Sequence, residues 1–359
     1  MKVIISGGGT GGHIYPALAI ADTIKSKHPD AEILFVGRKG GLESEIIPKY
    51  GYPMEYITVG YLKRKVSFHN VKSGWKLIQG LAQSAKILRR FSPDVVIGTG
   101  GFVSGPIVYA AARKKIPTML HEQNVYPGLT NKLLGKKVDI IAISFEDSEK
   151  YFDHSKKIIL TGNPIRKAFR MPPHSERKTR KTRVLVFGGS GGADKINQGI
   201  LWIAENHPEL PYKILAVSGK YYYEQMNKAS QHPDIEVVDY LEDMPEKMKS
   251  ADLIISSAGA ITITEILATG KPAILIPKAY TAENHQEHNA RSLESKGGAI
   301  VILEKNFSGE KLHHEVMGLM ENQNLLKEMG SRNAALAQEG TEDELYQLFL
   351  DLYKTQEIN

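Results

Sequence analysis

The sequence predicts an α/β protein built from two doubly wound, Rossmann-like domains. Short β-branched runs alternate with longer amphipathic stretches, and this alternation stops and restarts near the middle of the chain. A glycine cluster also follows the first expected strand of each half. Alternation of this kind is typical of right-handed βαβ units on a parallel sheet. A chain of 359 residues is long enough for two such domains, each with its own core.

The expected strands are short apolar runs of the kind that parallel sheets bury. In the first half they cover residues 2–6, 33–36, 95–98 and 118–120, with helices over 16–26 and 105–114. Pro16 suits the first turn of its helix, where a missing N–H leaves no carbonyl unpaired. In the second half the expected strands cover residues 183–187, 213–217, 235–238, 253–256 and 273–276.

A proline-containing, basic segment separates the two halves. Residues 161–183 include three prolines and end in a basic run without apolar periodicity, which is typical of a linker. We therefore expect an N-terminal domain at residues 1–163 and a C-terminal domain at residues 164–340.

Residues 341–359 should form a final helix. Four apolar residues spaced three or four apart would share one face of it. They are Leu345, Leu348, Phe349 and Leu352. The sequence leaves open which domain this helix packs against.

Composition and charge narrow the functional class. The absence of cysteine excludes thiolate catalysis, disulfides, zinc–thiolate sites and iron–sulfur clusters. A net charge of +6 favours anionic partners such as phosphates, anionic lipid or nucleic acid, although solubility alone explains it equally well. No apolar run reaches the ~18 residues of a membrane-spanning helix, and the N-terminus has no signal-peptide pattern. We therefore expect a cytoplasmic protein.

Four glycine-rich loops follow expected strands, at the end of a doubly wound sheet where ligands bind. Glycine lets backbone N–H groups approach a phosphate or sugar, and a following helix N-terminus adds partial positive charge. A tight turn explains any one loop equally well, but glycine clusters that open both halves favour ligand binding. The loops cover residues 7–13, 98–106, 188–193 and 256–260.

The first loop formally matches the dinucleotide-binding pattern through Gly7, Gly9 and Gly12. NAD binding would favour an acid after the second strand, but Arg38 and Lys39 stand there, so NADP remains open. No loop carries the Gly-Lys-Ser/Thr of NTP-hydrolysing proteins. Two α/β domains facing one another across a cleft suit a reaction with two substrates, as in GT-B glycosyltransferases. The lack of an Asp-x-Asp pair favours a mechanism without a metal.

Seven motifs occur in order along the chain. They are GGTGGHIYPALA (8–19), GGFVSGP (100–106), HEQN (121–124), GNPIR (162–166), GGSGGA (188–193), GAITITE (259–265) and NHQEHNA (284–290). In these motifs the sequence resembles the MurG family of N-acetylglucosaminyltransferases over almost its whole length. That family transfers GlcNAc from UDP-GlcNAc to the C4 hydroxyl of MurNAc in undecaprenyl-linked lipid I, which gives lipid II for peptidoglycan. The resemblance implies a GT-B fold without cofactor or metal.

For the nucleotide, the resemblance implies a site in the C-terminal domain. Glu265 would accept both ribose hydroxyls, and Arg166 would place a fixed positive charge against the leaving UDP. Tyr240 would lie against the uracil, and the Leu241 backbone would contact the edge of the base. The resemblance also implies donor contacts by Ala260, Ile261 and Thr262, which form the first turn of the helix that carries Glu265.

For the diphosphate and the sugar of the donor, two further segments are implied. Ser190 and Gly191 would hold the diphosphate in the third glycine loop. His285, Gln286 and Asn289 lie within two helical turns and would meet the GlcNAc hydroxyls. An ordinary polar helix face is the alternative for these three residues.

For the acceptor, the resemblance implies His13 as general base. An inverting transfer requires the acceptor hydroxyl to lose its proton, and a histidine at a helix N-terminus tends to stay neutral. Capping of the helix or binding of a phosphate or hydroxyl is the alternative for His13. Glu122 is the rival base, or else a structural carboxylate that pairs with a loop N–H. The acceptor-binding residues implied are Thr10, Gly11, Gly12, Ser104 and Asn124.

Because the acceptor carries a lipid, the resemblance implies peripheral attachment to the cytoplasmic face of the bacterial membrane. An apolar segment with a basic rim suits anionic lipid, although a helix that packs its apolar face on the domain fits equally well. The segment contains Lys72, Trp75, Lys76 and Ile78. The partners expected are therefore UDP-GlcNAc, lipid I and the anionic inner membrane surface, with no nucleic acid.

Three positions depart from the family's pattern. Ser257 stands where the family usually has arginine, Gly191 stands where a larger side chain is usual, and His285 replaces the glutamine of some relatives. Rival functions are a GT-B transferase with another lipid or small-molecule acceptor, a UDP-GlcNAc 2-epimerase, and an NAD(P) oxidoreductase. An epimerase would turn over the nucleotide sugar without any acceptor.

Overall fold

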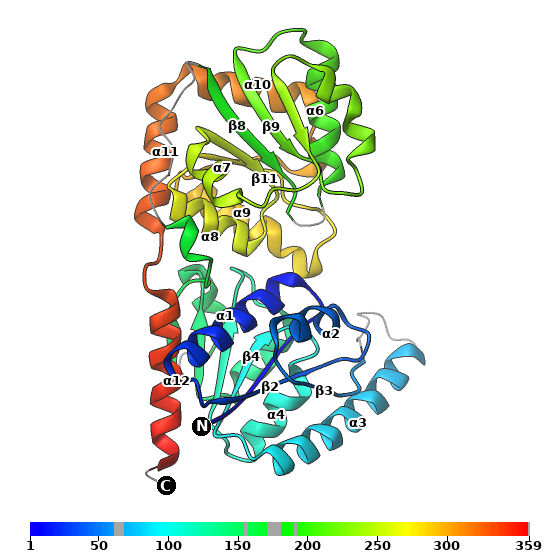
Figure 1. Cartoon of the computed structure of the whole chain (residues 1–359), viewed down its shortest axis with the longest axis vertical. Helices are drawn as coiled ribbons and strands as arrows, with labels where there is room; N and C mark the ends of the chain where they lie inside the picture. The colour runs from blue at the N-terminus through cyan, green and yellow to red at the C-terminus, as the bar shows by residue number, and fades with distance from the viewer. Residues whose placement is uncertain (61–67, 154–156, 171–180, 190–191, 358–359) are drawn as a thin grey trace. The chain divides into compact units, whose positions relative to one another are not determined.

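The computed structural model describes the chain except for residues 61–67, 154–156, 171–180, 190–191 and 358–359. The side chains of residues 68–73 and 356–357 are likewise outside the description. The chain forms two compact units (Figure 1). Unit 1 comprises Met1–Pro164 and Glu339–Asn359, and unit 2 comprises Ile165–Gln338.

Unit 1 is built on a parallel sheet of seven strands in the order β3-β2-β1-β4-β5-β6-β7. Val3 pairs with Ile33 on one side and with Val95 on the other, so β1 is an internal strand. The order reverses between β1 and β4, which makes this pair the topological switch point. The strands are β1 (Lys2–Gly7), β2 (Glu32–Gly37), β3 (Met54–Tyr56), β4 (Val95–Gly100), β5 (Thr118–Glu122), β6 (Ile140–Ile143) and β7 (Lys157–Leu160).

Helices cover both faces of this sheet, because successive side chains of its strands point to opposite sides. Val3 and Ile5 belong to a core with α1 and α12, whereas Ile4 belongs to a second core with α3 and α4. The helices are α1 (Gly11–Lys27), α2 (Leu42–Ile46), α3 (Phe68–Phe91), α4 (Gly105–Arg113), α5 (Leu129–Gly135) and α12 (Thr341–Glu357), with 3₁₀ helices at Ile47–Tyr50 and Glu146–Tyr151.

Helix α1 begins five residues before the expected start at Pro16. It follows the first glycine loop directly, so Pro16 lies inside the helix rather than in its first turn. Because proline has no backbone N–H, the helix lacks one hydrogen-bond donor at that position. Because Thr10 is the N-cap, His13 becomes the third residue of the helix, close to its positive end.

The C-terminal helix α12 packs on unit 1. Its four apolar residues named above are buried in the core that contains Ala17 and Ala21 of α1. Thr341 Oγ1 donates to the Thr161 carbonyl at 2.8 Å, and Tyr346 Oη lies 2.6 Å from His28 Nε2. The chain thus returns to the first unit after completing the second (Figure 1).

Unit 2 repeats the plan with six parallel strands in the order β10-β9-β8-β11-β12-β13, so that its switch point lies between β8 and β11. The strands are β8 (Thr182–Phe187), β9 (Tyr212–Val217), β10 (Ile235–Val238), β11 (Leu253–Ser256), β12 (Ala273–Leu275) and β13 (Ala299–Val301). The helices are α6 (Asp194–Asn206), α7 (Met244–Ser250), α8 (Ala260–Thr269), α9 (His285–Ser295), α10 (Gly309–Glu321) and α11 (Gln323–Leu336). The 3₁₀ helices are Lys167–Phe169, Glu224–Gln231, Ala282–Asn284 and Glu304–Asn306.

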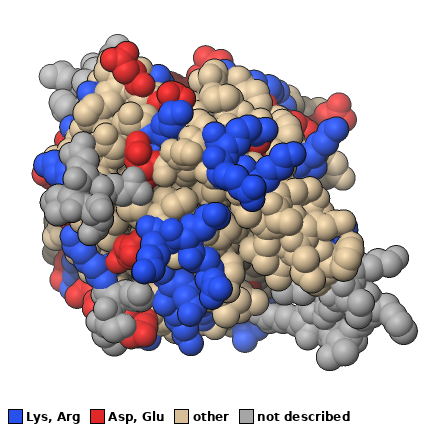
Figure 2. Space-filling view, turned by 90° about the horizontal axis from the view of Figure 1, so that it is seen from below, with Lys and Arg blue, Asp and Glu red and all other residues tan. Residues whose placement is uncertain are grey.

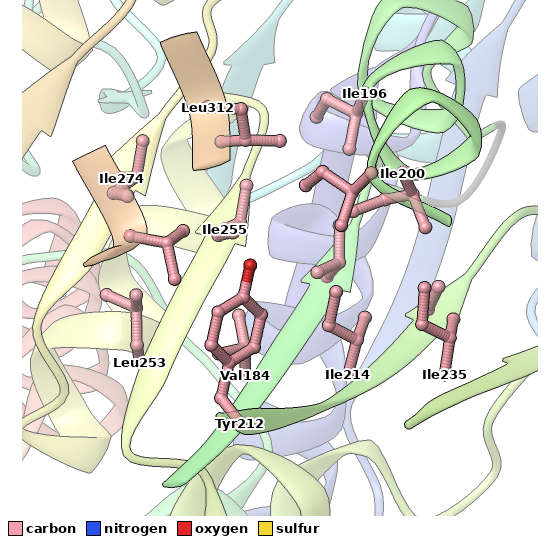
Figure 3. Packing of buried hydrophobic residues seen from close by; sticks show 14 of the residues in the cluster. Val184, Ile196, Ile200, Tyr212, Ile214, Ile235, Leu253, Ile255, Ile274 and Leu312 are labelled. Atoms are coloured by element: carbon pink, nitrogen blue, oxygen red, sulfur yellow. The ribbon is translucent and has the colours of Figure 1, made fainter. Parts of the chain in front are cut away.

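The main core of unit 2 lies between its sheet and helices α6 and α10. Figure 3 shows Tyr212 among aliphatic side chains such as Val184, Ile214 and Leu253. The Tyr212 ring is fully buried, and its hydroxyl lies 2.8 Å from His313 Nδ1. A buried phenol needs such a partner, because an unpaired hydroxyl in an apolar core is unfavourable.

The surface is basic in places, in line with the net charge. Figure 2 shows several groups of Lys and Arg side chains on one face, where Asp and Glu are fewer. Within the part of the chain that the structure describes, no helix is long and apolar enough to cross a bilayer.

Candidate active site

The carboxyl ends of β1, β4 and β5 carry the first candidate site, at the switch point of unit 1. The first two loops touch one another there: Gly8 N–H donates to the Gly100 carbonyl at 3.4 Å. A Cβ on Gly101 would lie 2.2 Å from the Gly8 carbonyl oxygen, and Gly101 has a φ of +76°. Only glycine fits this close, left-handed turn.

A carboxylate that the sequence analysis missed lies under the first loop. Glu43 is fully buried on α2, and its two oxygens accept the Gly9 N–H at 3.0 Å and the Arg38 N–H at 3.1 Å. A Cβ on Gly8 would lie 2.6 Å from Glu43 Cδ. A loop that already donates to a fixed negative charge is a poor cradle for a pyrophosphate. The arrangement therefore disfavours the dinucleotide interpretation of this loop.

His13 projects from the first turn of α1 into this site. Its Nδ1 lies 2.9 Å from Gln123 Oε1. Thr99 Oγ1 donates to the His13 carbonyl at 2.8 Å and ties the helix start to β4. Burial lowers the pKa of His13 below its usual 6.5, although the bonds to Gln123 and to the Thr99 backbone oppose this shift. The imidazole is therefore neutral at pH 7, as a proton acceptor must be.

For Glu122, the sequence left two roles open, a rival base and a structural carboxylate. Its carboxylate is 1% exposed and accepts four hydrogen bonds, three from the loop after β5 and one from α5. Burial raises the pKa of Glu122, and these donors oppose that shift. A carboxylate so fully occupied favours the structural interpretation, in which Glu122 shapes the loop after β5. The donors are the backbone N–H groups of Asn124 and Gly128 and the side-chain amides of Asn124 and Asn131.

The remaining acceptor-side residues fall into two groups. Thr10 and Gly12 are exposed at the start of α1, Gly11 is partly buried between them, and Asn124 is partly buried after β5. Ser104 instead is fully buried, and its hydroxyl donates to the Gly101 carbonyl at 3.0 Å. The Ser104 side chain therefore shapes its own loop, so that any contact of this segment with the acceptor would be made by the loop backbone.

The third glycine loop occupies the equivalent place in unit 2. Gly192 has a φ of +71°, and its N–H donates to the Gly189 carbonyl at 3.0 Å. Lys278 Nζ donates to the Gly192 carbonyl at 2.7 Å. Lys278 was not predicted from the sequence, because a single lysine after a strand belongs to no recognisable motif. Ser190 and Gly191, the residues expected to hold the diphosphate, lie outside the described residues.

The start of α8 offers an anion three backbone donors. Gly259 is its N-cap, and the first helical bond runs from the Ile263 N–H to the Gly259 carbonyl. The N–H groups of Ala260, Ile261 and Thr262 have no acceptor among the described residues, and the first turn contains no acid. Their positive partial charges add to that of the helix dipole. By contrast, α6 begins with Asp194.

Glu265 lies one turn further along α8, on the same face as Thr262. Burial raises the pKa of Glu265 to about 7, and the nearby positive charge of Arg166 partly offsets this rise. The exposed Arg166 guanidinium also lies 5.2 Å from the centre of the Phe169 ring. A carboxylate thus lies near a cation, one turn from N–H groups that have no acceptor among the described residues.

The three polar residues of α9 do not form one surface. Asn289 is fully buried, and its Nδ2 donates to the Ala258 carbonyl at 3.2 Å. Gln286 Oε1 accepts the Lys278 N–H at 3.0 Å, and the exposed His285 places Nδ1 2.7 Å from the Ala282 carbonyl. Asn289 therefore holds the loop before α8 through this bond. Tyr240 is largely exposed after β10, and Leu241 is partly buried.

The segment expected to meet the membrane lies at the start of α3. Trp75 is 65% exposed, Ile78 is 59% exposed, and Lys76 is also exposed. The Lys72 side chain lies outside the described residues. Later turns of α3 pack on unit 1, where Ile87 and Leu88 are buried. The apolar side chains near the start of this helix are therefore not accounted for by packing.

Comparisons with known proteins cover nearly the whole chain. Models of the glycosyltransferase family 28 N-terminal and C-terminal domains match residues 3–143 and 183–345. The UDP-N-acetylglucosamine–N-acetylmuramyl-(pentapeptide) pyrophosphoryl-undecaprenol N-acetylglucosamine transferase of Alkaliphilus oremlandii is 51% identical over 98% of each chain. The transferase of the same name from Clostridioides difficile is 46% identical over 99% of this chain and 90% of its own.

Solved structures are also similar to this chain over nearly its whole length. Acinetobacter baumannii MurG has a TM-score of 0.82 at 27% identity and covers 98% of this chain and 99% of its own. The UDP-GlcNAc 2-epimerase of Neisseria meningitidis has a TM-score of 0.64 at 13% identity, covers 98% of this chain and all of its own, and shares the fold alone. The chain therefore belongs to the MurG group of glycosyltransferase family 28 and has its GT-B fold.

Proposed function

We propose that the chain transfers GlcNAc from UDP-GlcNAc to the MurNAc unit of lipid I, which gives lipid II. The observation that carries this proposal is the 51% identity to a transferase of that name along 98% of both chains. The site geometry supports it: unit 1 holds a neutral histidine at its switch point, and unit 2 holds unpaired N–H groups at its own. Glycosyl transfer requires a base for the acceptor hydroxyl and positive charge for the leaving diphosphate, and each unit supplies one of the two.

The transfer inverts the anomeric carbon. His13 accepts the proton of the MurNAc C4 hydroxyl as that oxygen forms its bond to C1 of GlcNAc. The bond from C1 to UDP breaks, and its electron pair leaves with the diphosphate. The N–H groups of Ala260, Ile261 and Thr262, together with the Arg166 guanidinium, stabilise the charge that develops there.

Donor recognition follows from the other residues of unit 2. Glu265 accepts the ribose hydroxyls, and the exposed ring of Tyr240 packs against the uracil beside the Leu241 backbone. His285 and Gln286 face the sugar, and Ser190 and Gly191 hold the diphosphate. In unit 1, Thr10, Gly11, Gly12 and Asn124 contact the acceptor.

One assay tests the reaction. The protein is incubated with labelled UDP-GlcNAc and a chelator, with and without a lipid I analogue. Release of UDP that requires the analogue and survives chelation supports the proposal. Conversion of the nucleotide sugar without acceptor would indicate an epimerase, and transfer only to other lipids or small molecules would indicate a different GT-B transferase.

We also propose that the start of α3 attaches the protein to the cytoplasmic face of the membrane. Trp75 and Ile78 would enter the interface, with Lys76 against anionic headgroups. In co-sedimentation with anionic vesicles, Trp75→Ser combined with Ile78→Ser should weaken binding at least about tenfold, because two large apolar side chains no longer leave water. Tyr221→Ser, which removes an exposed ring from unit 2, is the control. Equal binding by all three proteins would exclude this surface.

A further inference from the structure

A chain of hydrogen bonds leads from the His13 ring into the interior of unit 1. His13 Nδ1 lies 2.9 Å from Gln123 Oε1, and Gln123 Nε2 lies 2.9 Å from His121 Nδ1. His121 Nε2 lies 3.0 Å from the Gly162 carbonyl oxygen. His121 and Gln123 are both fully buried, although neither belongs to the reacting groups assigned above. The chain joins segments about 110 and 40 residues apart in sequence.

The buried end of this chain fixes where each proton sits. The Gly162 carbonyl can only accept, so His121 Nε2 carries the hydrogen and His121 Nδ1 is the bare nitrogen. The Ser144 hydroxyl, 3.3 Å from the same Nε2, is itself 2.8 Å from the Glu122 carbonyl and 2.9 Å from Asn163 Oδ1. Its own proton is therefore used by an acceptor, which leaves its lone pair for the His121 N–H.

The orientation of the Gln123 amide is fixed in the same way. Its Nε2 lies 3.0 Å from the His121 carbonyl, which again can only accept, so the NH₂ group faces His121. The carbonyl oxygen of the amide must then face His13. An oxygen acceptor opposite His13 Nδ1 requires that this nitrogen carries the hydrogen. One arrangement of protons satisfies every bond, and it leaves His13 Nε2 with its lone pair.

We propose that Gln123 and His121 are positioning residues that hold His13 in the tautomer with a bare Nε2. This tautomer is a property of the free protein, and its use in catalysis rests on the proposed function. In the transfer step, the O–H bond of the acceptor breaks and its proton moves to Nε2. The ring becomes an imidazolium, and its Nδ1–H bond to Gln123 Oε1 persists and becomes charge-assisted.

The opposite tautomer is disfavoured at two points. A bare Nδ1 would face the Gln123 oxygen with two lone pairs in contact, and an N–H on Nε2 would leave no acceptor for the hydroxyl proton. His121 cannot relieve the first conflict by taking up a proton. Its burial lowers its pKa to about 4, with the Gly162 carbonyl opposing this shift and the neighbouring His13 adding to it. Above about pH 5, His121 therefore stays neutral, and the hydrogen-bond chain through Gln123 keeps its polarity.

The tautomer is measured directly by nitrogen-15 NMR of the full-length protein labelled on histidine. For the wild type at pH 7.5, we expect the His13 resonances of a protonated Nδ1 and an unprotonated Nε2. Gln123→Met, similar in size but without an amide, should move His13 toward a mixture of tautomers. Ser144→Ala, which removes one buried bond to His121 but leaves the Gly162 carbonyl, should keep the wild-type pattern. A wild-type His13 with its hydrogen on Nε2 would overturn the proposal.

Kinetics separate positioning from a merely structural role. Gln123→Met should lower kcat about tenfold or more, as part of the ~10²–10⁴-fold that a general base contributes. The KM for UDP-GlcNAc should stay within about twofold. Gln123→Glu keeps an oxygen acceptor for Nδ1–H but places its second oxygen where the NH₂ group faced His121, so it should restore only part of kcat. Its negative charge should also shift the acid limb of the pH–kcat profile to higher pH.

Two results keep this proposal distinct from the proposed function. If Gln123→Glu is no faster than Gln123→Met and the acid limb of its pH–kcat profile does not move, Gln123 and His121 do not act through His13. If His13 shows the expected tautomer but His13→Ala turns over normally, the hydrogen-bond chain does fix the tautomer and the base assignment is wrong.

Discussion

The two glycine-rich loops that open the units are paired with opposite charges. In unit 1, the Gly9 N–H donates to the buried Glu43 carboxylate. In unit 2, the Gly192 carbonyl accepts from the Lys278 ammonium. Both loops follow a strand at the switch point of a parallel sheet, and both lead into a helix.

This difference shows that a shared glycine pattern does not imply a shared ligand. A carboxylate under the first loop repels a second anion, so that loop serves to place His13 at a helix start. A cation beside the third loop, with free N–H groups at the start of α8 close to the same switch point, attracts a diphosphate. Unit 1 should therefore control the chemical step and unit 2 the affinity for UDP.

Loss of the imidazole should give the largest effect. His13→Ala should lower kcat by ~10²–10⁴-fold, because the acceptor hydroxyl then has no base. The Kd of UDP should not change, since the proposed donor site lies in unit 2. Turnover with a lipid I analogue and calorimetry with UDP measure the two quantities. His28→Ala, another histidine of unit 1, is the control, and turnover of His13→Ala within about tenfold of wild type would rule out the base.

Loss of the ribose acceptor should act on affinity instead. Glu265→Ala should raise the Kd of UDP by about 10- to 100-fold, which corresponds to hydrogen bonds with a charged group of about 1.5–3 kcal/mol. The control is Glu236→Gln, an exposed carboxylate in the same unit. If UDP binds Glu265→Ala as tightly as wild type, the ribose lies elsewhere.

The binding of UDP should also depend on pH through Glu265. Its raised pKa of about 7 means that the carboxyl group is largely protonated at pH 6. The ribose hydroxyls donate to the ionised form, so affinity should rise with pH and level off above pH 8. At pH 6 the Kd should be about tenfold higher than on this plateau.

Glu265→Gln supplies the reference for that measurement. The phosphates of UDP titrate identically with both proteins, so the difference between the two pH profiles isolates the carboxyl group. Parallel profiles would mean that Glu265 does not change its ionisation when UDP binds.

The smallest effect on the reaction should come from Glu43. Glu43→Gln replaces one acceptor oxygen by an NH₂ group that faces a backbone N–H. The free energy of unfolding of unit 1 should fall by about 1–3 kcal/mol, with UDP affinity unchanged. Denaturant unfolding measures this, with the exposed Glu45→Gln on the same helix as control. A variant as stable as Glu45→Gln would show that the loop does not depend on the carboxylate.

Much of the fold follows from local sequence signals. The apolar runs at β1, β4 and β8 and the glycine loops after them lie as expected, because strand periodicity and turn chemistry are local. Strands β3 and β13 have three residues each, too few for any period to show. Pro16 misplaced the start of α1, because the helix begins directly after the first glycine loop and carries Pro16 in its interior.

The candidate site was less predictable, because its partners come from distant segments. His13 and Glu265 stand in recognisable motifs, but Glu43 and Lys278 acquire their roles only through contacts 34 and 86 residues away. Ser104 and Asn289 stand in motifs expected to contact ligands, and both make buried hydrogen bonds to loop carbonyls. A polar residue in a motif can bind a ligand or shape the backbone that does, and burial decides between the two.

Mapping of UDP onto the backbone amides of the labelled protein tests the comparison most directly. We predict large chemical-shift changes at Gly192 and at Ala260, Ile261 and Thr262, with the Gly9 amide unmoved because it stays bonded to Glu43. Large changes at Gly8, Gly9 and Gly11, with the start of α8 unaffected, would contradict the assignment of the diphosphate to unit 2.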